Sequence, residues 1–283
     1  MKQPTIFFGS SIYTLPIIAF LQKQYDLKLV LTTEQKLTDA VPKYCKEHDI
    51  LYESVTSLKE NTIIIQKLQI IHAEFAILAY FGAIIPQSII TLFPKGIINI
   101  HPSRLPQYRG TTPGQTAILL GDIRTAVSIM LLDKEIDHGP LLGQEVENIL
   151  PTDTAPRLYK RLFDKGVTLL AKILPIYLSG ELLPKAQDHN KATYTKVLTR
   201  ESGFLNDKLP VAPGLLERMV RAYDPWPGVW TRVTRLKDTV LTGKIVKFLP
   251  NDMIQVEGKK PVSYRDFRNG YKHADLWLSK FLT

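Results

Sequence analysis

Two polar side chains interrupt an otherwise apolar segment, Ile97–His101. If this segment is a β-strand, its period of two places Asn99 and His101 on the same face. Pro102 cannot continue a ladder of strand hydrogen bonds, so His101 lies at the carboxyl end of the strand, the edge where open α/β sheets bind their ligands. A histidine there can move a proton, and a neighbouring asparagine can donate to an oxyanion. Taken alone, the segment fits a catalytic pair and a hydrogen-bonded core histidine equally well.

A second polar cluster, Asp133–Asp137, follows another apolar segment, Val127–Leu132. Its three carboxylates alternate along the chain, but Lys134 lies among them and the glycine-bearing loop of a calcium site is missing, which argues against a metal. A single carboxylate that reaches His101 is a simpler interpretation, since it would orient the imidazole and favour its protonated form. Asparagine, histidine and aspartate together would suffice for acyl transfer without a metal or a covalent nucleophile.

Most cofactor and nucleophile motifs are missing from the chain. It has no Gly-x-Gly-x-x-Gly, no phosphate-binding loop, no His-Glu-x-x-His and no Gly-x-Ser-x-Gly. Cys45 is the single cysteine, so neither an intrachain disulfide nor a thiolate metal cage is possible. Nucleotide hydrolysis, zinc proteolysis and serine hydrolysis therefore have no support in the sequence.

The first part of the chain alternates strand-like and helix-like segments, which is typical of a parallel sheet with crossover helices. Apolar residues at helical spacing predict helices from Ser10 to Lys23 and from Thr154 to Leu178. Short segments rich in Ile, Val, Leu and Phe predict strands that are buried on both faces: Thr5–Phe8, Leu27–Thr32, Phe75–Tyr80, Ile97–His101 and Val127–Leu132. We therefore expect an α/β fold with a mostly parallel sheet.

A polar segment without helical periodicity, from Leu183 to Ser202, predicts a linker between two domains. Beyond it, the pattern of Val211–Tyr223 predicts a helix. The rest alternates turn residues with short β-rich segments, which predict a small β-barrel: Val229–Val233, Thr239–Leu241, Lys244–Leu249 and Met253–Val256. The predicted division is a first domain at 1–182, a linker at 183–203 and a C-terminal domain at 204–283.

The 283-residue chain has a net charge of +9, and nearly all of the excess lies in its last third. Residues 1–190 hold 19 Lys and Arg against 18 Asp and Glu, whereas residues 191–283 hold 17 against 9. A basic appendage on a neutral body is typical of a protein that binds nucleic acid, and a merely solvated basic surface fits the charge equally well. With no apolar segment of membrane-spanning length and no secretory signal, we expect a cytoplasmic protein without a membrane partner.

Taken together, the polar segments resemble those of the 10-formyltetrahydrofolate-dependent formyltransferases. Two downstream segments are similar to members of that family that act on methionyl-tRNA. The resemblance covers nearly the whole chain and rests on Phe8–Ser10, Ala79–Pro86, Asn99–Gly110, Met130–Gly139, Tyr194–Gly203 and Arg221–Gly228.

The resemblance implies a Rossmann-like catalytic domain followed by a C-terminal β-barrel related to the OB fold. It implies that Asn99, His101 and Asp137 are catalytic and transfer the formyl group of 10-formyltetrahydrofolate to the α-amino group of initiator methionyl-tRNA. We expect a monomer that needs no metal. Folate binding would fall to twelve residues: Tyr80, Phe81, Gly82, Ala83, Ile84, Ile85, Pro86, Ser103, Arg104, Leu105, Pro106 and Gly139.

Three departures from the family pattern leave alternatives open. First, Arg104 and His138 stand where the family usually has leucine and threonine. Second, the long basic loop after the second strand is largely missing at Thr32–Asp39, and third, the C-terminal barrel is abbreviated between Thr231 and Tyr264. The missing loop favours a sugar-nucleotide N-formyltransferase, whereas the basic last third favours tRNA. A tRNA-binding module without catalysis is a third alternative, against which the intact triad argues. Relatives that hydrolyse formyltetrahydrofolate or formylate glycinamide ribonucleotide share the triad but generally lack such a basic domain.

Overall fold

The computed structural model describes residues 1–33, 40–234, 236 and 240–282. They pack into two compact units, each made of three stretches of the chain. The first unit comprises Met1–Gly110, Arg124–Glu147 and Tyr159–Tyr194, and the second comprises Thr111–Ile123, Asn148–Leu158 and Thr195–Thr283. The chain passes from the first unit to the second three times, after Gly110, Glu147 and Tyr194. The division into 1–182, 183–203 and 204–283 stays a prediction.

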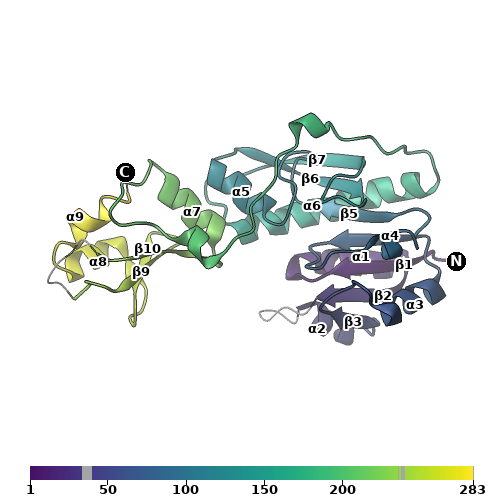
Figure 1. Ribbon diagram of the computed structural model, residues 1–283, viewed down its shortest axis with the longest axis horizontal. Helices are drawn as coiled ribbons and strands as arrows, with labels where there is room; N and C mark the ends of the chain where they lie inside the picture. Colours follow the sequence, from purple (N-terminus) through teal and green to yellow (C-terminus); the bar gives the residue numbers. More distant parts are fainter. Residues whose placement is uncertain (34–39, 235, 237–239, 283) are drawn as a thin grey trace. The chain divides into compact units, whose positions relative to one another are not determined.

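A seven-stranded sheet forms the centre of the first unit, in the order β3-β2-β1-β4-β5-β6-β7 (Figure 1). Its strands are β1 (Pro4–Gly9), β2 (Asp26–Thr33), β3 (Tyr52–Val55), β4 (Phe75–Ala79), β5 (Ile97–His101), β6 (Arg124–Leu131) and β7 (Leu141–Asn148). Neighbours from β3 to β5 pair in parallel, and β6 pairs antiparallel with β5. The predicted mostly parallel α/β sheet is confirmed.

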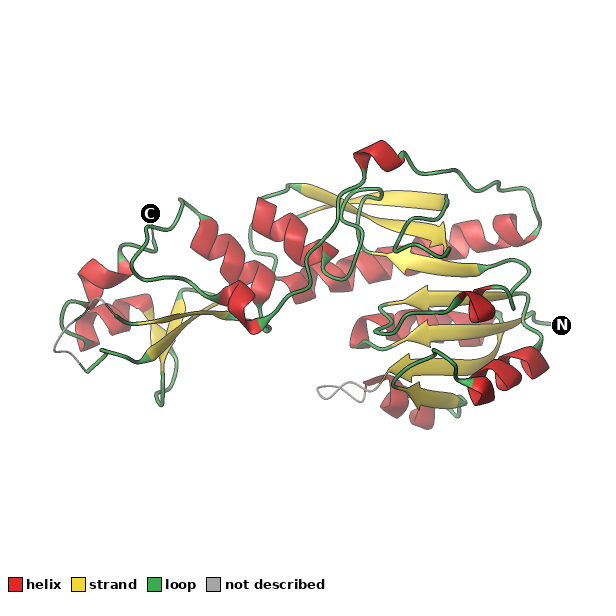
Figure 2. Ribbon diagram, viewed as in Figure 1, coloured by secondary structure: helices red, strands yellow, loops and turns green. Residues whose placement is uncertain are grey.

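Helices cover both faces of this sheet (Figure 2): α1 (Leu15–Gln24), α2 (Ala40–Glu47), α3 (Thr62–Ile71), α4 (Gln87–Ile90) and α6 (Ala155–Leu178). Alternation along β1 explains this arrangement, because Ile6 and Phe8 point to one face and Phe7 to the other. On the first face, Ile64 of α3 and Ile89 of α4 join Ile6 and Phe8 in one buried cluster. Burial of each such side chain stabilises the fold by about 1.5–3 kcal/mol.

The loops that follow β1, β4 and β5 meet at one edge of the sheet, because these three strands are parallel neighbours. Ser10, directly after β1, donates its backbone N–H to the Tyr80 carbonyl directly after β4, at 3.1 Å. The sheet also continues in opposite directions from β1, toward β2 and toward β4. In doubly wound sheets the carboxyl edge at such a switch point is the usual ligand site.

The second unit contains a four-stranded sheet in the order β11-β10-β9-β8, with antiparallel neighbours. Its strands are β8 (Val229–Arg232), β9 (Ile245–Leu249), β10 (Met253–Val256) and β11 (Val262–Ser263), and its helices are α5 (Pro113–Leu120), α7 (Leu215–Tyr223), α8 (Tyr264–Gly270) and α9 (Ala274–Leu278). α5 packs against α7, where the Arg218 Nε donates to the Leu119 carbonyl at 3.1 Å. Trp277 of α9 is fully buried and stacks on Phe248 of β9.

Several element boundaries differ from the predicted ones. The first predicted helix begins with a 3-10 turn, η1 (Ile12–Thr14), because the Ser11 hydroxyl accepts from the Tyr13 N–H and α1 starts only afterwards. α7 begins at Leu215 rather than at 211, since Gly214 caps it in the left-handed region. Part of the predicted strand Thr239–Leu241 and most of the shortened loop Thr32–Asp39 lie outside the described residues.

None of the described helices is long and apolar enough to cross a membrane.

Candidate active site

The structure brings Asn99, His101 and Asp137 together in the first unit. Asn99 and His101 lie at the end of β5, and Asp137 lies on the loop between β6 and β7. The Asn99 Nδ2 donates to the Asp137 Oδ1 at 3.2 Å, and the His101 Nδ1 lies 3.5 Å from that same oxygen. All three residues are buried. A polar cluster of this kind inside an apolar sheet edge is the site's central feature, and the catalytic role of each residue stays a prediction.

Both ring nitrogens of His101 face oxygen atoms that can only accept. Its Nε2 lies 3.1 Å from the Tyr108 carbonyl oxygen, and its Nδ1 faces the Asp137 carboxylate. A carbonyl and a carboxylate both accept, so each ring nitrogen has an acceptor near it. An imidazole N–H held in this position is a group that can donate to a developing oxyanion.

Asp137 is fixed in an uncommon conformation. Its φ of +46° lies in the left-handed region, which a residue with a side chain adopts only when its surroundings hold it there. Its Oδ2 accepts the Gly110 N–H at 2.7 Å, while its Oδ1 accepts from Asn99. Both carboxylate oxygens thus have partners, and the carboxylate has a defined orientation toward His101.

The segment predicted to bind folate, Tyr80–Pro86, directly follows β4 at the same sheet edge. Ile85 is buried in the core cluster and anchors the segment, whereas Ile84 is 89 % exposed and Tyr80 is 38 % exposed. Desolvation raises the pKa of the Tyr80 phenol, so its hydroxyl stays protonated at neutral pH. Folate binding by this segment stays a prediction.

The predicted residues after β5 divide into two groups. The Ser103 hydroxyl donates to the Gln107 carbonyl at 2.7 Å, and the Leu105 N–H donates to the Ser128 hydroxyl at 3.2 Å. Both residues are buried, so they hold the shape of the loop. Pro106 is half-buried, and Arg104 is exposed.

Sequence reasoning missed Gln187, which lies in the segment predicted to be a linker. Its Nε2 donates to the backbone carbonyls of Asp137, at 2.9 Å, and Gly139, at 2.7 Å. Its Oε1 accepts from Arg109 at 2.8 Å. A lone glutamine among polar residues carries no pattern that would indicate such a contact.

Two histidines, His138 and His189, lie next to Gln187 and Arg109. The rings of His138 and His189 stack with centroids 4.0 Å apart, and the His138 Nδ1 is 2.6 Å from the Asp133 carboxylate. Arg109 donates to the His189 Nδ1 at 2.9 Å, which requires that nitrogen to be unprotonated. His138 is one of the departures from the family pattern, and here it covers the ring that accepts from Arg109.

Residues 22–174, more than half of the chain, match the family model described as formyl transferase. The chain belongs to the formyl transferase family. This formyl transferase is 42 % identical over 184 residues to a methionyl-tRNA formyltransferase of Chloroflexus aurantiacus, an alignment that covers 65 % of this chain and 58 % of the relative's length.

A second relative aligns over more of its length. It is a methionyl-tRNA formyltransferase of Buchnera aphidicola, 31 % identical over 260 residues, with 87 % of this chain and 81 % of the relative covered. Among solved structures, a 4-N formyltransferase from Francisella tularensis superposes with a TM-score of 0.69 at 16 % identity, over 88 % of this chain and 96 % of that one. The structural likeness establishes a shared fold.

The described part of this formyl transferase contains no group of three His, Cys, Asp or Glu side chains that could hold a metal ion. Cys45 is buried, and burial raises the pKa of its thiol to about 11. It stays protonated at neutral pH and is a poor nucleophile.

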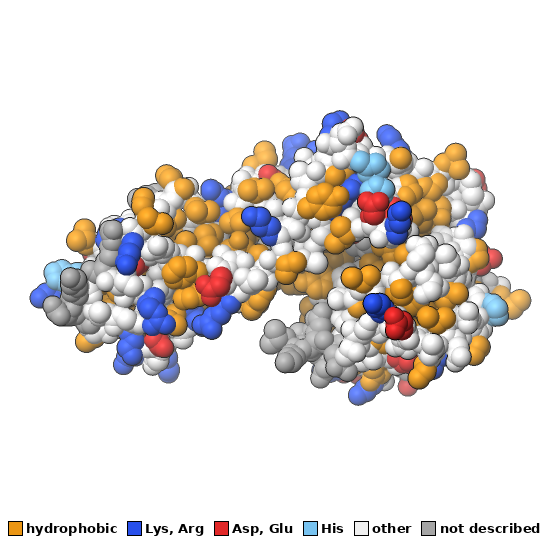
Figure 3. Space-filling model, viewed as in Figure 1, with side chains coloured by type: hydrophobic (Ala, Val, Ile, Leu, Met, Phe, Trp, Pro, Cys, Tyr) orange, Lys and Arg blue, Asp and Glu red, His pale blue; other side chains and the backbone are white. Residues whose placement is uncertain are grey.

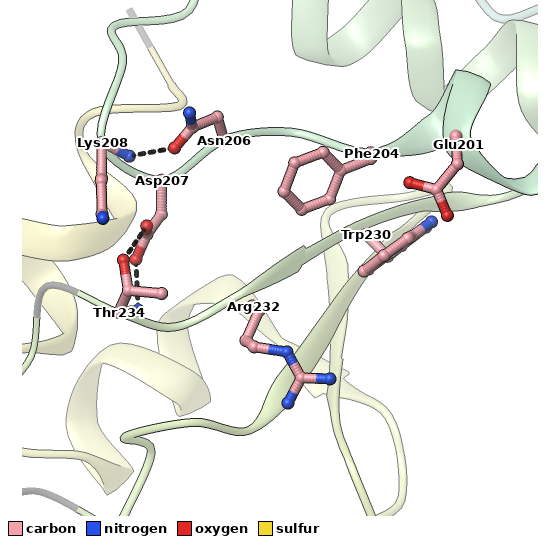
Figure 4. A pocket seen from close by; sticks show the side chains of 8 residues that line it. All are labelled: Glu201, Phe204, Asn206, Asp207, Lys208, Trp230, Arg232 and Thr234. Carbon is pink, nitrogen blue, oxygen red and sulfur yellow. Dashed lines mark hydrogen bonds between the residues drawn. The ribbon is translucent and has the colours of Figure 1, made fainter.

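The second unit of this formyl transferase exposes many cations, which spread over its visible face in Figure 3. A cavity of about 400 Å³ in this unit is lined by two aromatic rings, two cations and two carboxylates, together with two neutral polar side chains (Figure 4): Phe204, Trp230, Lys208, Arg232, Glu201, Asp207, Asn206 and Thr234. The two ring centroids are 4.8 Å apart, and the Arg200 guanidinium lies over the Trp230 ring at 5.3 Å.

Proposed function

We propose that this formyl transferase moves the formyl group of 10-formyltetrahydrofolate to the α-amino group of initiator methionyl-tRNA. The observation that carries the proposal is the buried group of Asn99, His101 and Asp137 at the carboxyl edge of the sheet. The names of the relatives from Chloroflexus and Buchnera, and the basic second unit, support methionyl-tRNA as the acceptor.

The residues of the site act on the charge that develops during transfer. When the amine attacks the formyl carbon, negative charge grows on the formyl oxygen, and Asn99 and protonated His101 donate to it. His101 exchanges its contact with the Tyr108 carbonyl for this oxygen. Asp137 keeps the imidazole oriented and helps to move the proton that the amine loses. The bond between the formyl carbon and N10 then breaks, the oxyanion becomes a carbonyl again, and N10 takes up that proton as tetrahydrofolate leaves. Each oxyanion donor contributes about 3–4 kcal/mol to the lowering of the barrier.

The donor's ring system would lie on the Tyr80–Pro86 segment, with the loop at 103–106 and Gly139 completing the pocket. Support comes from the exposed Ile84 beside the buried Ile85, a surface that an aromatic ring would cover. When bound, the donor supplies the activated formyl group, and the chain supplies its orientation and the exclusion of water.

The second unit would bind the tRNA through its phosphates, as an abbreviated relative of the OB-fold barrel. Its antiparallel four-stranded sheet and its surface cations support this role. Phe204 and Trp230 offer rings on which a nucleobase can stack. We infer a cytoplasmic monomer.

The affinity for tRNA is expected to fall steeply as the salt concentration rises. In a plot of the logarithm of the association constant against the logarithm of the salt concentration, each neutralised phosphate contributes about −0.7 to −0.9 to the slope. Replacing Lys208 and Arg232 with alanine should reduce that slope by about one for each phosphate contact removed. Filter binding of the full-length variants across a salt series measures the slope. Lys43→Ala, which removes an exposed lysine of the first unit, is the matched control. An unchanged slope in the double variant would remove these two cations from the interface.

A sugar-nucleotide N-formyltransferase is the second candidate, favoured by the shortened segment Thr32–Asp39. The deciding experiment offers 10-formyltetrahydrofolate together with charged initiator tRNA or with amino-sugar nucleotides. We expect transfer to methionyl-tRNA. Transfer to the sugar alone would overturn the proposal and establish the alternative.

A further inference from the structure

We propose that Gln187 is a positioning residue for the reaction, held by Arg109, and that it acts by fixing the backbone on which Asp137 is carried. The expected effect of Gln187 on the reaction rate rests on the proposed function, whereas its effect on the backbone of the Asp137 loop does not. Gln187 does not contact the His101 imidazole or the Asp137 carboxylate in the described structure; its contacts are with the loop behind them.

Both N–H groups and the oxygen of the Gln187 amide have hydrogen-bond partners. Its two N–H groups go to the carbonyls of Asp137 and Gly139, two residues apart on one tight loop, and its oxygen goes to Arg109. The side chain is 5 % exposed. A buried amide that bridges two carbonyls restrains the peptide planes that follow Asp137 and Gly139, and therefore the direction of the Asp137 side chain.

Arg109 in turn fixes the Gln187 amide in one orientation. The guanidinium is 1 % exposed and donates to Gln187, His189 and the Tyr194 hydroxyl, at 2.8, 2.9 and 3.1 Å. Because a guanidinium can only donate, the Gln187 oxygen must face it, and the amide nitrogen must face the loop. Hydrogen bonds from a charged donor are about twice as strong as neutral ones, so a flipped amide is excluded.

The restraint matters because Asp137 has a positive φ. A left-handed conformation costs about 1–3 kcal/mol for a residue with a side chain, and the loop would relax if the contacts behind it were lost. Relaxation would move the carboxylate away from Asn99 and His101. A displacement of about 1 Å in such a group can cost about 100-fold in rate.

Gln187→Glu separates this role from simple packing of Arg109. The glutamate keeps the shape and still accepts from Arg109, but it cannot donate to the two loop carbonyls. We expect kcat to fall by about 10- to 100-fold, with KM for both substrates within about threefold of the wild type. Gln187→Met loses the contact with Arg109 as well as those with the loop carbonyls, so its kcat should fall at least as far. Gln187→Asn, too short to bridge the carbonyls, replaces Gln187→Glu if that variant does not fold.

Gln22 provides the matched control. Its side chain is exposed, and its Nε2 also donates to a backbone carbonyl, that of His48 at 3.1 Å. Gln22→Glu and Gln22→Met should retain wild-type kcat. If Gln187→Glu also retains it, the amide serves only as a partner of Arg109 and the proposal is wrong.

A second readout is independent of any reaction. The Gly110 N–H donates to the Asp137 Oδ2, so its hydrogen exchange reports the orientation of the carboxylate. We expect this amide to exchange at least about tenfold faster in Gln187→Glu, with β5 amides unchanged. Unchanged exchange at Gly110 overturns the positioning role. The wild-type enzyme could formylate neither methionyl-tRNA nor an amino-sugar nucleotide, while Gly110 still exchanges faster in Gln187→Glu than in the wild type. That result would refute the proposed function and leave the positioning role standing.

Discussion

Replacing His101 with alanine is expected to lower kcat for formyl transfer by at least about 100-fold while the protein stays folded. The imidazole lies between the Asp137 carboxylate and the Tyr108 carbonyl, and alanine offers neither a donor for the oxyanion nor a proton carrier. Single-turnover formylation measures the chemical step directly. His48→Ala is the control, because the His48 ring is exposed and contacts Tyr44 of α2, away from Asn99 and Asp137 in the sequence.

Asn99→Ala should cause a comparable loss, and the double variant should lose far less than the product of the two, since both residues serve one oxyanion. If His101→Ala retained more than about a tenth of wild-type kcat/KM while folded, the acyl-transfer assignment would fail.

Gly139→Ala is expected to destabilise the first unit by about 3 kcal/mol and to lower activity with it. A Cβ at this position would lie 2.0 Å from the Leu131 carbonyl oxygen, a backbone atom at the end of β6. Leu131 pairs with Ile98 of β5, so moving it away disturbs the strand that carries Asn99 and His101. Denaturant unfolding of the full chain, followed by a probe in the first unit, measures the loss.

Gly143→Ala is the control for this substitution. Gly143 lies in β7, where a new Cβ meets its nearest neighbour, Ile173, at an ordinary 3.5 Å. It should change stability by less than about 1 kcal/mol. Equal stability of Gly139→Ala and Gly143→Ala would mean that the loop adapts, and would contradict the close contact on which the prediction depends.

The sheet was predictable where its strands are buried on both faces, because such strands appear as short apolar segments. β7 was not predicted, since its residues alternate and only Leu142 is buried. Its Glu145 and Glu147 instead pair with Lys165 of α6. In the second unit, α8 and α9 are short and interrupted, and their pattern becomes clear only when Trp277 and Phe267 are seen inside the same core.

The candidate site shows the same limit. Asn99 and His101 are two residues apart, so a local pattern brings them to notice, and Asp137 was assigned only through the family resemblance. Gln187 is polar, lies among polar residues, and comes 50 positions after the residue whose carbonyl it binds. Its contacts with the Asp137 loop form only when distant parts of the chain pack together, and a periodic pattern in the sequence does not indicate such contacts.

Because Gln187 lies 50 residues after Asp137, it is synthesised later than the loop that it holds. A ribosome adds about 5–20 residues per second, so Gln187 is made about 3–10 s after Asp137. During that interval the nascent chain already holds all three residues of the triad, while the loop carrying Asp137 lacks its restraint. A fragment ending at residue 182 would remain in that state permanently. We therefore expect full activity to be acquired late in synthesis, when the segment after α6 folds back over the finished sheet.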